Sequence, residues 1–182
     1  MPASYKSRAA RPLWQSLAVF LLGFFVLQLG WNQARGTRLE YWVIDCATVR
    51  TSVALINTLT PQVAAAARGP SVLASDGGIN VRNGCEGTEI LFLLIAALLA
   101  YPFSWRLRLV GAVAGAAYVF LINQVRLLAL FYSIRSDRAL FNQLHGVIAP
   151  LVLILCTLAF FIALRAWDRH PRADVPRTDA GG

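Results

Sequence analysis

Three residues whose side chains do chemistry stand at the ends of apolar segments: Cys85, Arg126 and His145. A thiol becomes a nucleophile when it loses its proton, and an imidazole takes and returns a proton near neutral pH. A guanidinium stabilises negative charge that develops on a substrate. These groups are the working parts of a cysteine protease or transpeptidase, and they predict a thiol enzyme if the chain brings them together.

Cys85 lies in the segment from Asn83 to Gly87, directly ahead of an apolar stretch. The helix that this stretch predicts would begin near the thiol, and free backbone amides at a helix amino terminus favour a thiolate. Glu86 and Glu89 oppose that effect, because nearby negative charge raises the pKa of a thiol. A reactive Cys85 therefore requires a cation close by.

Arg126 lies inside the apolar run from Tyr118 to Leu128, and its guanidinium stays charged. Burying that charge costs several kcal/mol unless the group is paired or reaches water. One interpretation is that Arg126 extends to the outer headgroups, since it lies near the end of its segment. The other makes it a site residue, and Asn123, one helical turn earlier on the same face, favours this second interpretation.

The composition predicts a membrane protein, because 57% of the residues are hydrophobic and only 14% are charged. About 20 apolar residues cross the hydrocarbon core of a bilayer, which is roughly 30 Å thick. Four apolar segments come near that length, at about residues 13–31, 88–103, 107–132 and 147–167. We therefore predict an all-α integral membrane protein, a four-transmembrane-helix bundle made by residues 13–168.

Basic residues predict how this bundle is oriented. Residues 1–12 are a basic amino terminus, and the first span is too long for a cleavable signal core. The positive-inside bias places this terminus, the turn with Arg106 and Arg108, and the disordered tail 169–182 in the cytoplasm. The long loop between the first two spans is then periplasmic. It should carry an interfacial helix over Tyr41 to Leu59 and a small β-hairpin around residues 76–78.

The same topology puts the three candidate residues on one membrane face. The second, third and fourth spans run out-to-in, in-to-out and out-to-in, so Cys85, Arg126 and His145 share a face whichever way the protein inserts. His145 precedes the fourth span, where a lone histidine is most often an interfacial residue. Its position beside a thiol and a cation makes it a candidate general base or acid.

The remaining features favour a membrane enzyme without cofactors. The net charge of +8 comes from basic residues that flank apolar segments, which is typical of contact with anionic lipids and not of a nucleic-acid surface. No metal-ligand spacing and no glycine-rich phosphate loop occur. Cys156 is most simply an apolar packing residue. A disulfide between Cys46 and Cys85 would block the chemistry, and the sequence leaves that pairing open.

The motifs around these residues resemble those of the exosortase/archaeosortase family over about Ile79 to Cys156. The resemblance consists of the Cys motif from Asn83 to Gly87, the Arg motif from Asn123 to Arg126 and the His motif from Phe141 to His145, in the family's order. The chain is most similar to the short branch, with exosortase H nearest. It departs from many members in having Thr88 and Glu89 after the Cys motif.

The resemblance implies a multi-pass enzyme of the inner membrane with its active site facing the periplasm. Its partners would be exported proteins that carry a carboxy-terminal motif, a transmembrane helix and a basic cluster. By this resemblance Cys85 attacks the scissile carbonyl, His145 transfers protons, and Arg126 stabilises the oxyanion or orients the substrate. A thioester forms and passes to an acceptor, with Asn123, Asn83 and Gly87 in supporting positions.

Two other functions are open at this point. The chain could be a non-enzymatic scaffold or assembly subunit of an envelope or exopolysaccharide system, because membrane placement does not establish catalysis. It could also be a thiol acyltransferase acting on lipid or polysaccharide. The sorting motif, the acceptor (water or amine) and the oligomeric state are not determined by the sequence.

Overall fold

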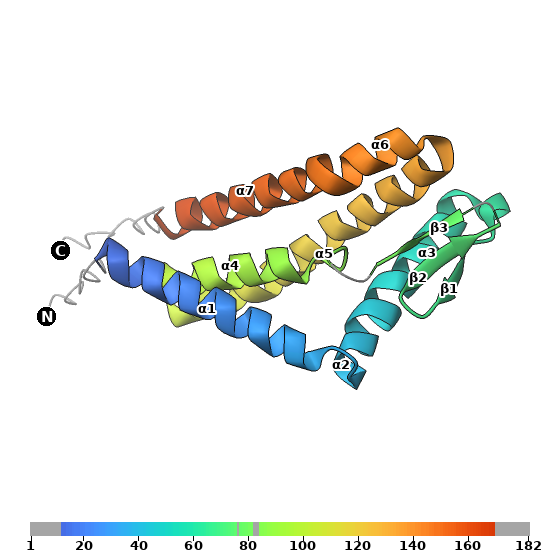
Figure 1. Ribbon diagram of the computed structural model, residues 1–182. Coiled ribbons are helices and arrows are strands. Elements are labelled where there is room, and N and C mark those ends of the chain that lie inside the picture. The colour runs from blue at the N-terminus through green and yellow to red at the C-terminus, as the bar shows by residue number, and fades with distance from the viewer. Residues whose placement is uncertain (1–11, 76, 82–83, 170–182) are drawn as a thin grey trace, which may run out of the picture.

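The computed structural model describes residues 12–75, 77–81 and 84–169. It is mostly helical (80%), with a small sheet at one end of a helical bundle (Figure 1). Its long helices are α1 (Leu13–Ala34), α5 (Trp105–Ser136) and α7 (Ala149–Arg169). Asn83, the tail from residue 170 and all but the last residue of the predicted basic amino terminus lie outside the described residues.

Shorter elements connect these helices. Between α1 and the sheet lie α2 (Arg38–Tyr41), the π-helix η1 (Trp42–Val49), α3 (Arg50–Leu59) and the 3₁₀ turn η2 (Pro61–Val63). The sheet consists of β1 (Ala66–Arg68), β2 (Ser71–Ala74) and β3 (Gly77–Asn80), and α4 (Thr88–Ala100) follows it. Between α5 and α7 the chain forms α6 (Arg138–Gln143) and the π-helix η3 (Leu144–Ile148).

Among the described residues, three helical segments are long and apolar enough to cross a membrane: Leu13–Ala34, Trp105–Ser136 and the continuous Arg138–Asp168. Many of their large apolar side chains are exposed, among them Leu22, Phe25, Val113, Val125, Leu151 and Leu155. Apolar surface of this extent is unfavourable in water and matches the hydrocarbon of a bilayer. These helices therefore indicate a membrane protein.

The predicted second span is shorter than the others. Helix α4 has 13 residues and rises about 20 Å, which is less than the roughly 30 Å of a bilayer core. It ends at Ala100 because Pro102 follows, and the residue before a proline is disfavoured in a helix. That α4 is a fourth span stays a prediction.

Two glycines of α5 let the neighbouring helices approach closely. A Cβ at Gly111 would lie 2.7 Å from Leu164 Cδ2 of α7, and one at Gly115 would lie 2.5 Å from Leu94 Cδ2 of α4. Glycines four residues apart form a flat strip against which another membrane helix packs. The strip holds α4 and α7 against the first half of α5.

The predicted hairpin is part of a three-stranded antiparallel sheet in the order β1-β2-β3. The sequence did not indicate β1, because an alanine-rich stretch favours helix. Asn57 of α3 fixes the entry to this strand: its Nδ2 donates to the Ala65 carbonyl (2.9 Å) and its Oδ1 accepts from the Ala65 amide (2.8 Å).

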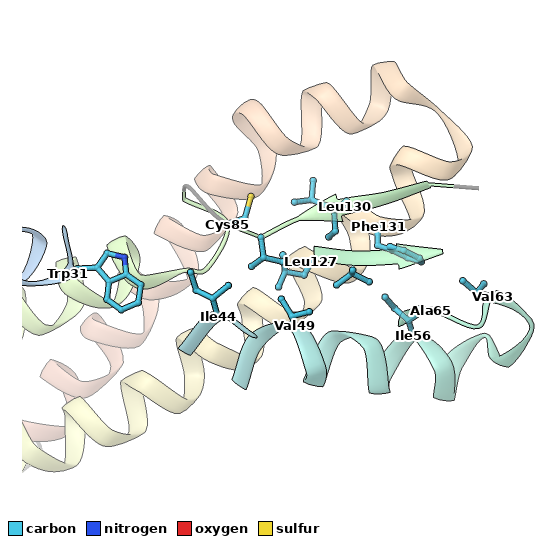
Figure 2. Packing of buried hydrophobic residues seen from close by; sticks show 13 residues of the cluster. Trp31, Ile44, Val49, Ile56, Val63, Ala65, Cys85, Leu127, Leu130 and Phe131 are labelled. Carbon is cyan, nitrogen blue, oxygen red and sulfur yellow. The ribbon is translucent and has the colours of Figure 1, made fainter. Parts of the chain in front are cut away.

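The sheet, η1, α3 and the second half of α5 enclose one buried core (Figure 2). Its residues are Trp31, Ile44, Val49, Ile56, Val63, Ala65, Val72, Ile79, Val81, Cys85, Leu127, Leu130 and Phe131. The helix predicted over Tyr41 to Leu59 is observed as the end of α2, then η1 and α3. It buries Ile44, Val49 and Ile56 in this protein core, whereas Trp42 and Leu59, predicted on the same apolar face, are exposed.

Candidate active site

Cys85 lies in a tight loop between β3 and α4 whose shape depends on glycine. Gly87 caps α4 with a φ of 81°, a conformation that costs most other residues roughly 1–2 kcal/mol. A Cβ at Gly87 would also lie 2.9 Å from Asn123 Cγ. The loop can therefore lie against α5 at this point only because residue 87 has no side chain.

Two side chains of helix α5 hold the loop by hydrogen bonds to the loop's own backbone carbonyl groups. Asn123 Nδ2 donates to the Cys85 carbonyl and Arg126 Nη1 donates to the Gly84 carbonyl, both at 3.1 Å. Asn123 is 1% exposed and Arg126 is 7% exposed. Arg126 thus turns into the protein, and the alternative in which it extends to the headgroups is not what the structure shows.

The three candidate groups meet at the sulfur of Cys85. Its Sγ lies 3.5 Å from His145 Nδ1, a hydrogen-bonding distance for sulfur, and Arg126 Nη2 lies 3.8 Å from the same Sγ. The thiol is buried, with 4% of the residue exposed, whereas His145 is exposed. The sulfur points toward the ribbon that contains His145 (Figure 2).

His145 lies in η3, inside a helical segment that is continuous from Arg138 to Arg169. The sequence places it just before the fourth span, and where that span begins stays a prediction. The helix itself begins earlier, where Asp137 Oδ1 accepts from the Ala139 amide. Phe141, one turn away, stacks on the imidazole with ring centroids 5.5 Å apart and an interplanar angle of 4°. This stacking fixes the plane of the ring opposite Cys85.

The pKa of the Cys85 thiol is raised above its ordinary value. Burial is the largest cause, the Arg126 guanidinium lowers the pKa, and the Glu86 carboxylate raises it. The thiolate that a helix amino terminus was expected to favour is therefore not the resting form, because burial disfavours charge. Of the two carboxylates predicted to act on the thiol, Glu86 is buried beside it and Glu89 is on the exposed face of α4.

Two buried polar atoms of the residues that hold the loop have no hydrogen-bond partner among the described residues: Asn123 Oδ1 and Arg126 Nε. Such atoms are uncommon inside proteins and often mark the place of a ligand, a water or a catalytic role. Here one acceptor and one donor have no partner, one turn apart on α5. They leave the site able to bind further polar groups.

All three cysteines are free, so no disulfide joins Cys46 to Cys85. In the part of the chain that the structure describes, no three His, Cys, Asp or Glu residues are grouped as metal ligands would be. Cys85 is thus a free thiol at the centre of the site.

Two contributors to the site were missed by the sequence analysis. Trp31, at the end of α1, donates through Nε1 to Glu86 Oε1 (3.4 Å), although 55 residues separate the two. A tryptophan near a span end is normally an interfacial anchor, so nothing in the sequence pointed to this contact. Phe141 was part of the His motif, but its stacking on His145 follows only from the helical geometry of α6 and η3.

The structure defines a helical membrane protein in which a buried thiol, an imidazole and a guanidinium converge, with Asn123 and Gly87 beside them. That these residues are catalytic stays a prediction. Comparisons of the chain with models of protein families, with curated proteins and with solved structures find no match.

Proposed function

We propose that this protein is a membrane cysteine endopeptidase or transpeptidase of the exosortase/archaeosortase type, which cleaves carboxy-terminal sorting signals of exported proteins. The observation that carries the proposal is the convergence on one sulfur: Cys85 Sγ lies 3.5 Å from His145 Nδ1 and 3.8 Å from Arg126 Nη2. A nucleophile within reach of a base and a cation is the arrangement that acyl transfer requires.

In the acylation step, His145 takes the thiol proton while the sulfur attacks the scissile carbonyl carbon. The C=O electrons move onto oxygen, and the oxyanion is stabilised by the guanidinium of Arg126. When the tetrahedral intermediate collapses, the C–N bond breaks and the imidazolium returns its proton to the leaving amine. The products are a thioester on Cys85 and the released carboxy-terminal fragment.

In the second step an amine or a water attacks the thioester carbonyl. His145 removes a proton from this acceptor, and the C–S bond breaks as the intermediate collapses. The thiolate then regains a proton from the imidazolium, which restores the resting site. Transfer to an amine attaches the exported protein to a new partner, and transfer to water releases it.

The orientation we propose is that of a multi-pass protein of the inner membrane, with four spans and the site facing the periplasm. The start of α1 and the end of α7 lie at one end of the bundle, and the sheet lies at the other (Figure 1). Arg106 and Arg108 lie in the first turn of α5, directly after the connection from α4 and at the end of these helices remote from Cys85, which fits a cytoplasmic end.

We also place the apolar helix of the substrate along a groove between α4 and α7, with a cavity volume of about 240 Å³. The groove is lined by Ile90, Leu93, Leu94, Ala97, Ile154, Thr157, Leu158 and Phe161. It begins one turn after Gly87 on α4 and extends away from Cys85. A peptide cleaved at Cys85 would thus enter an apolar channel directly after its scissile bond.

The test is processing of a tagged substrate in membranes that contain single-site variants. Cys85→Ala, Arg126→Ala and His145→Ala should each lower processing by a factor on the order of 10³ or more, because residues of one catalytic unit fail together. Cys156→Ala, which changes the thiol on α7, is the matched control and should process normally. Normal processing by Cys85→Ala would remove the proposal.

One observation favours a second candidate, a non-enzymatic scaffold. The shortest contact of Arg126 is with the Gly84 carbonyl, so its main role could be to hold the loop against α5. In that case Arg126→Ala should reduce the amount of protein in the membrane, and Cys85→Ser should have no effect on any function of the assembly.

A further inference from the structure

Glu86, the residue after the candidate nucleophile, is a buried carboxylate with three donors around it. It is 8% exposed. Its Oε2 accepts from the Gly84 amide at 2.8 Å, and its Oε1 accepts from Trp31 Nε1 at 3.4 Å and from Thr88 Oγ1 at 3.5 Å. The side chain therefore folds back over its own loop and reaches both α1 and the first residue of α4.

These contacts complement those made by α5. Arg126 and Asn123 bind the carbonyls of Gly84 and Cys85 from one side, and Glu86 binds the Gly84 amide and the Trp31 indole from the other. A buried carboxylate is costly to a fold unless its hydrogen bonds compensate for lost hydration. The hydrogen bonds that Glu86 makes with the loop, Trp31 and Thr88 therefore explain why a carboxylate is buried here.

We propose that Glu86 is a positioning residue for Cys85: it fastens the thiol-bearing loop to α1 and α4 and places a negative charge next to the sulfur. The catalytic consequence rests on the proposed function, whereas the structural and electrostatic consequences do not. Neither the contacts of Glu86 nor its burial is visible in the sequence, because the decisive partner, Trp31, is remote in the chain.

The charge of Glu86 has a defined effect on the thiol. Among the residues that the structure describes, the charged or titratable groups that face Cys85 are Glu86 from its own loop, Arg126 from α5 and His145 from η3, while Trp31 of α1 and Thr88 of α4 are uncharged. Glu86 raises the pKa of the thiol and Arg126 lowers it. A raised pKa means that the sulfur stays protonated until the pH is higher, so Glu86 adds to the larger effect of burial in keeping the resting group a thiol. The thiolate then arises by proton transfer to His145 during the reaction.

The experiment measures the rate of alkylation of Cys85 against pH in the full-length protein in lipid nanodiscs. Cys46→Ser and Cys156→Ala leave Cys85 as the single thiol, and iodoacetamide is the probe. Glu86→Gln should move the midpoint of the profile to lower pH and make alkylation faster at neutral pH. The amide oxygen can still accept from the Gly84 amide and the amide nitrogen can donate to Thr88 Oγ1, whereas Trp31 Nε1 loses its acceptor, so the loop keeps two of the three contacts. Arg126→Gln should move the midpoint in the opposite direction.

Glu89→Gln is the matched control, a carboxylate three residues away on the exposed face of α4, and its midpoint should equal that of the parent. Glu86→Asp keeps the negative charge and shortens the side chain, so it separates the effect of the charge from the effect of the hydrogen bonds. Its midpoint should stay near the parent value because the charge remains. Its processing of substrate should fall on the order of 10²-fold, because a shorter side chain cannot hold the loop in place.

An unchanged midpoint in Glu86→Gln, or the same downward movement in Glu86→Asp as in Glu86→Gln, would overturn the inference. If Glu86→Gln does not accumulate in the membrane, the comparison of Glu86→Asp with the parent decides. An alkylation midpoint of Glu86→Asp below that of the parent would then contradict the role of the charge. Alkylation needs no substrate, so these midpoints stand even if the protein proves not to be a peptidase.

Discussion

At Cys85 the protein surrounds a buried thiol with a carboxylate, a guanidinium and an imidazole. Burial and Glu86 raise the pKa of the thiol, and Arg126 lowers it. A neutral thiol is less prone to oxidation and alkylation than a thiolate, because the thiolate is the reactive form. In the proposed function, the thiol would therefore be activated by His145 only when a substrate arrives.

Gly87 provides the sharpest prediction for a single residue. Gly87→Ala should lower the free energy of unfolding by more than about 1 kcal/mol, because a φ of 81° is unfavourable for alanine and its Cβ would meet Asn123 at 2.9 Å. Thermal unfolding in nanodiscs measures the change. Gly30→Ala in α1, where a Cβ meets nothing within 4 Å, is the control and should be neutral or stabilising. Equal stability of the two variants would contradict this account of the loop.

How far the site was predictable depends on how far apart the residues lie along the chain. Cys85, Arg126 and His145 could be selected because each is a polar residue at the end of an apolar segment, and alternating spans put them on one face. Asn123 followed from helical periodicity. The contact of Trp31 with Glu86 could not be predicted, because no local pattern encodes a hydrogen bond across 55 residues.

Among the elements, α5 does most to position the site. Its first half presents Gly111 and Gly115 to α7 and α4, and its second half presents Asn123 and Arg126 to the Cys85 loop. The imidazole comes from η3, a π-helical segment of 5 residues. Short π segments inside helices are frequently found at functional sites, where they change the direction of one side chain.

The groove between α4 and α7 gives a prediction at this scale. Ala97→Phe should fill part of the groove and weaken binding of a substrate that has an apolar helix by about tenfold, which corresponds to about 1.4 kcal/mol. The measurement is the KM for processing. Alkylation of Cys85 should not change, because Ala97 is remote from the loop.

Ala117→Phe is the matched control, since Ala117 is exposed on α5 and lies outside the groove. Its KM should equal that of the parent. If Ala97→Phe also leaves the KM unchanged, the apolar part of the substrate does not use this groove.

Helices could be predicted where a segment of the sequence is long and apolar. Elements whose form depends on tertiary contacts could not be predicted. The long apolar helices were located, but α1 continues to Ala34 and α5 to Ser136, beyond the predicted 31 and 132. Those extensions are made of less apolar residues that hydropathy cannot assign. Strand β1 forms against its alanine-rich sequence because β2 offers it backbone hydrogen bonds. The π-helical form of η1 and η3 has no simple sequence signal.

For the whole molecule, the sheet and α3 lie at one end, and the start of α1 and the end of α7 lie at the other (Figure 1). The Cys85 loop connects the sheet to α4. In the proposed orientation the first end faces the periplasm. An exported protein would meet the thiol there while its apolar helix remains in the bilayer.

Single-cysteine labelling tests this orientation. In a background without the three native cysteines, Ala67→Cys on the exposed strand β1 should react with an impermeant maleimide in intact spheroplasts. Trp105→Cys, at a side chain that is 66% exposed at the start of α5, should react only after permeabilisation. The reverse pattern would place the site in the cytoplasm and exclude action on exported proteins.

The central claim, that Cys85 forms a covalent acyl-enzyme, is tested most directly by trapping. The protein in nanodiscs is incubated briefly with a tagged substrate, quenched in acid, digested and examined by mass spectrometry. The account predicts that the peptide containing Cys85 carries the amino-terminal part of the substrate through a bond that hydroxylamine cleaves, and that this adduct is absent from His145→Ala. Substrate cleavage without any adduct on Cys85, and at an unchanged rate in Cys85→Ala, would contradict it.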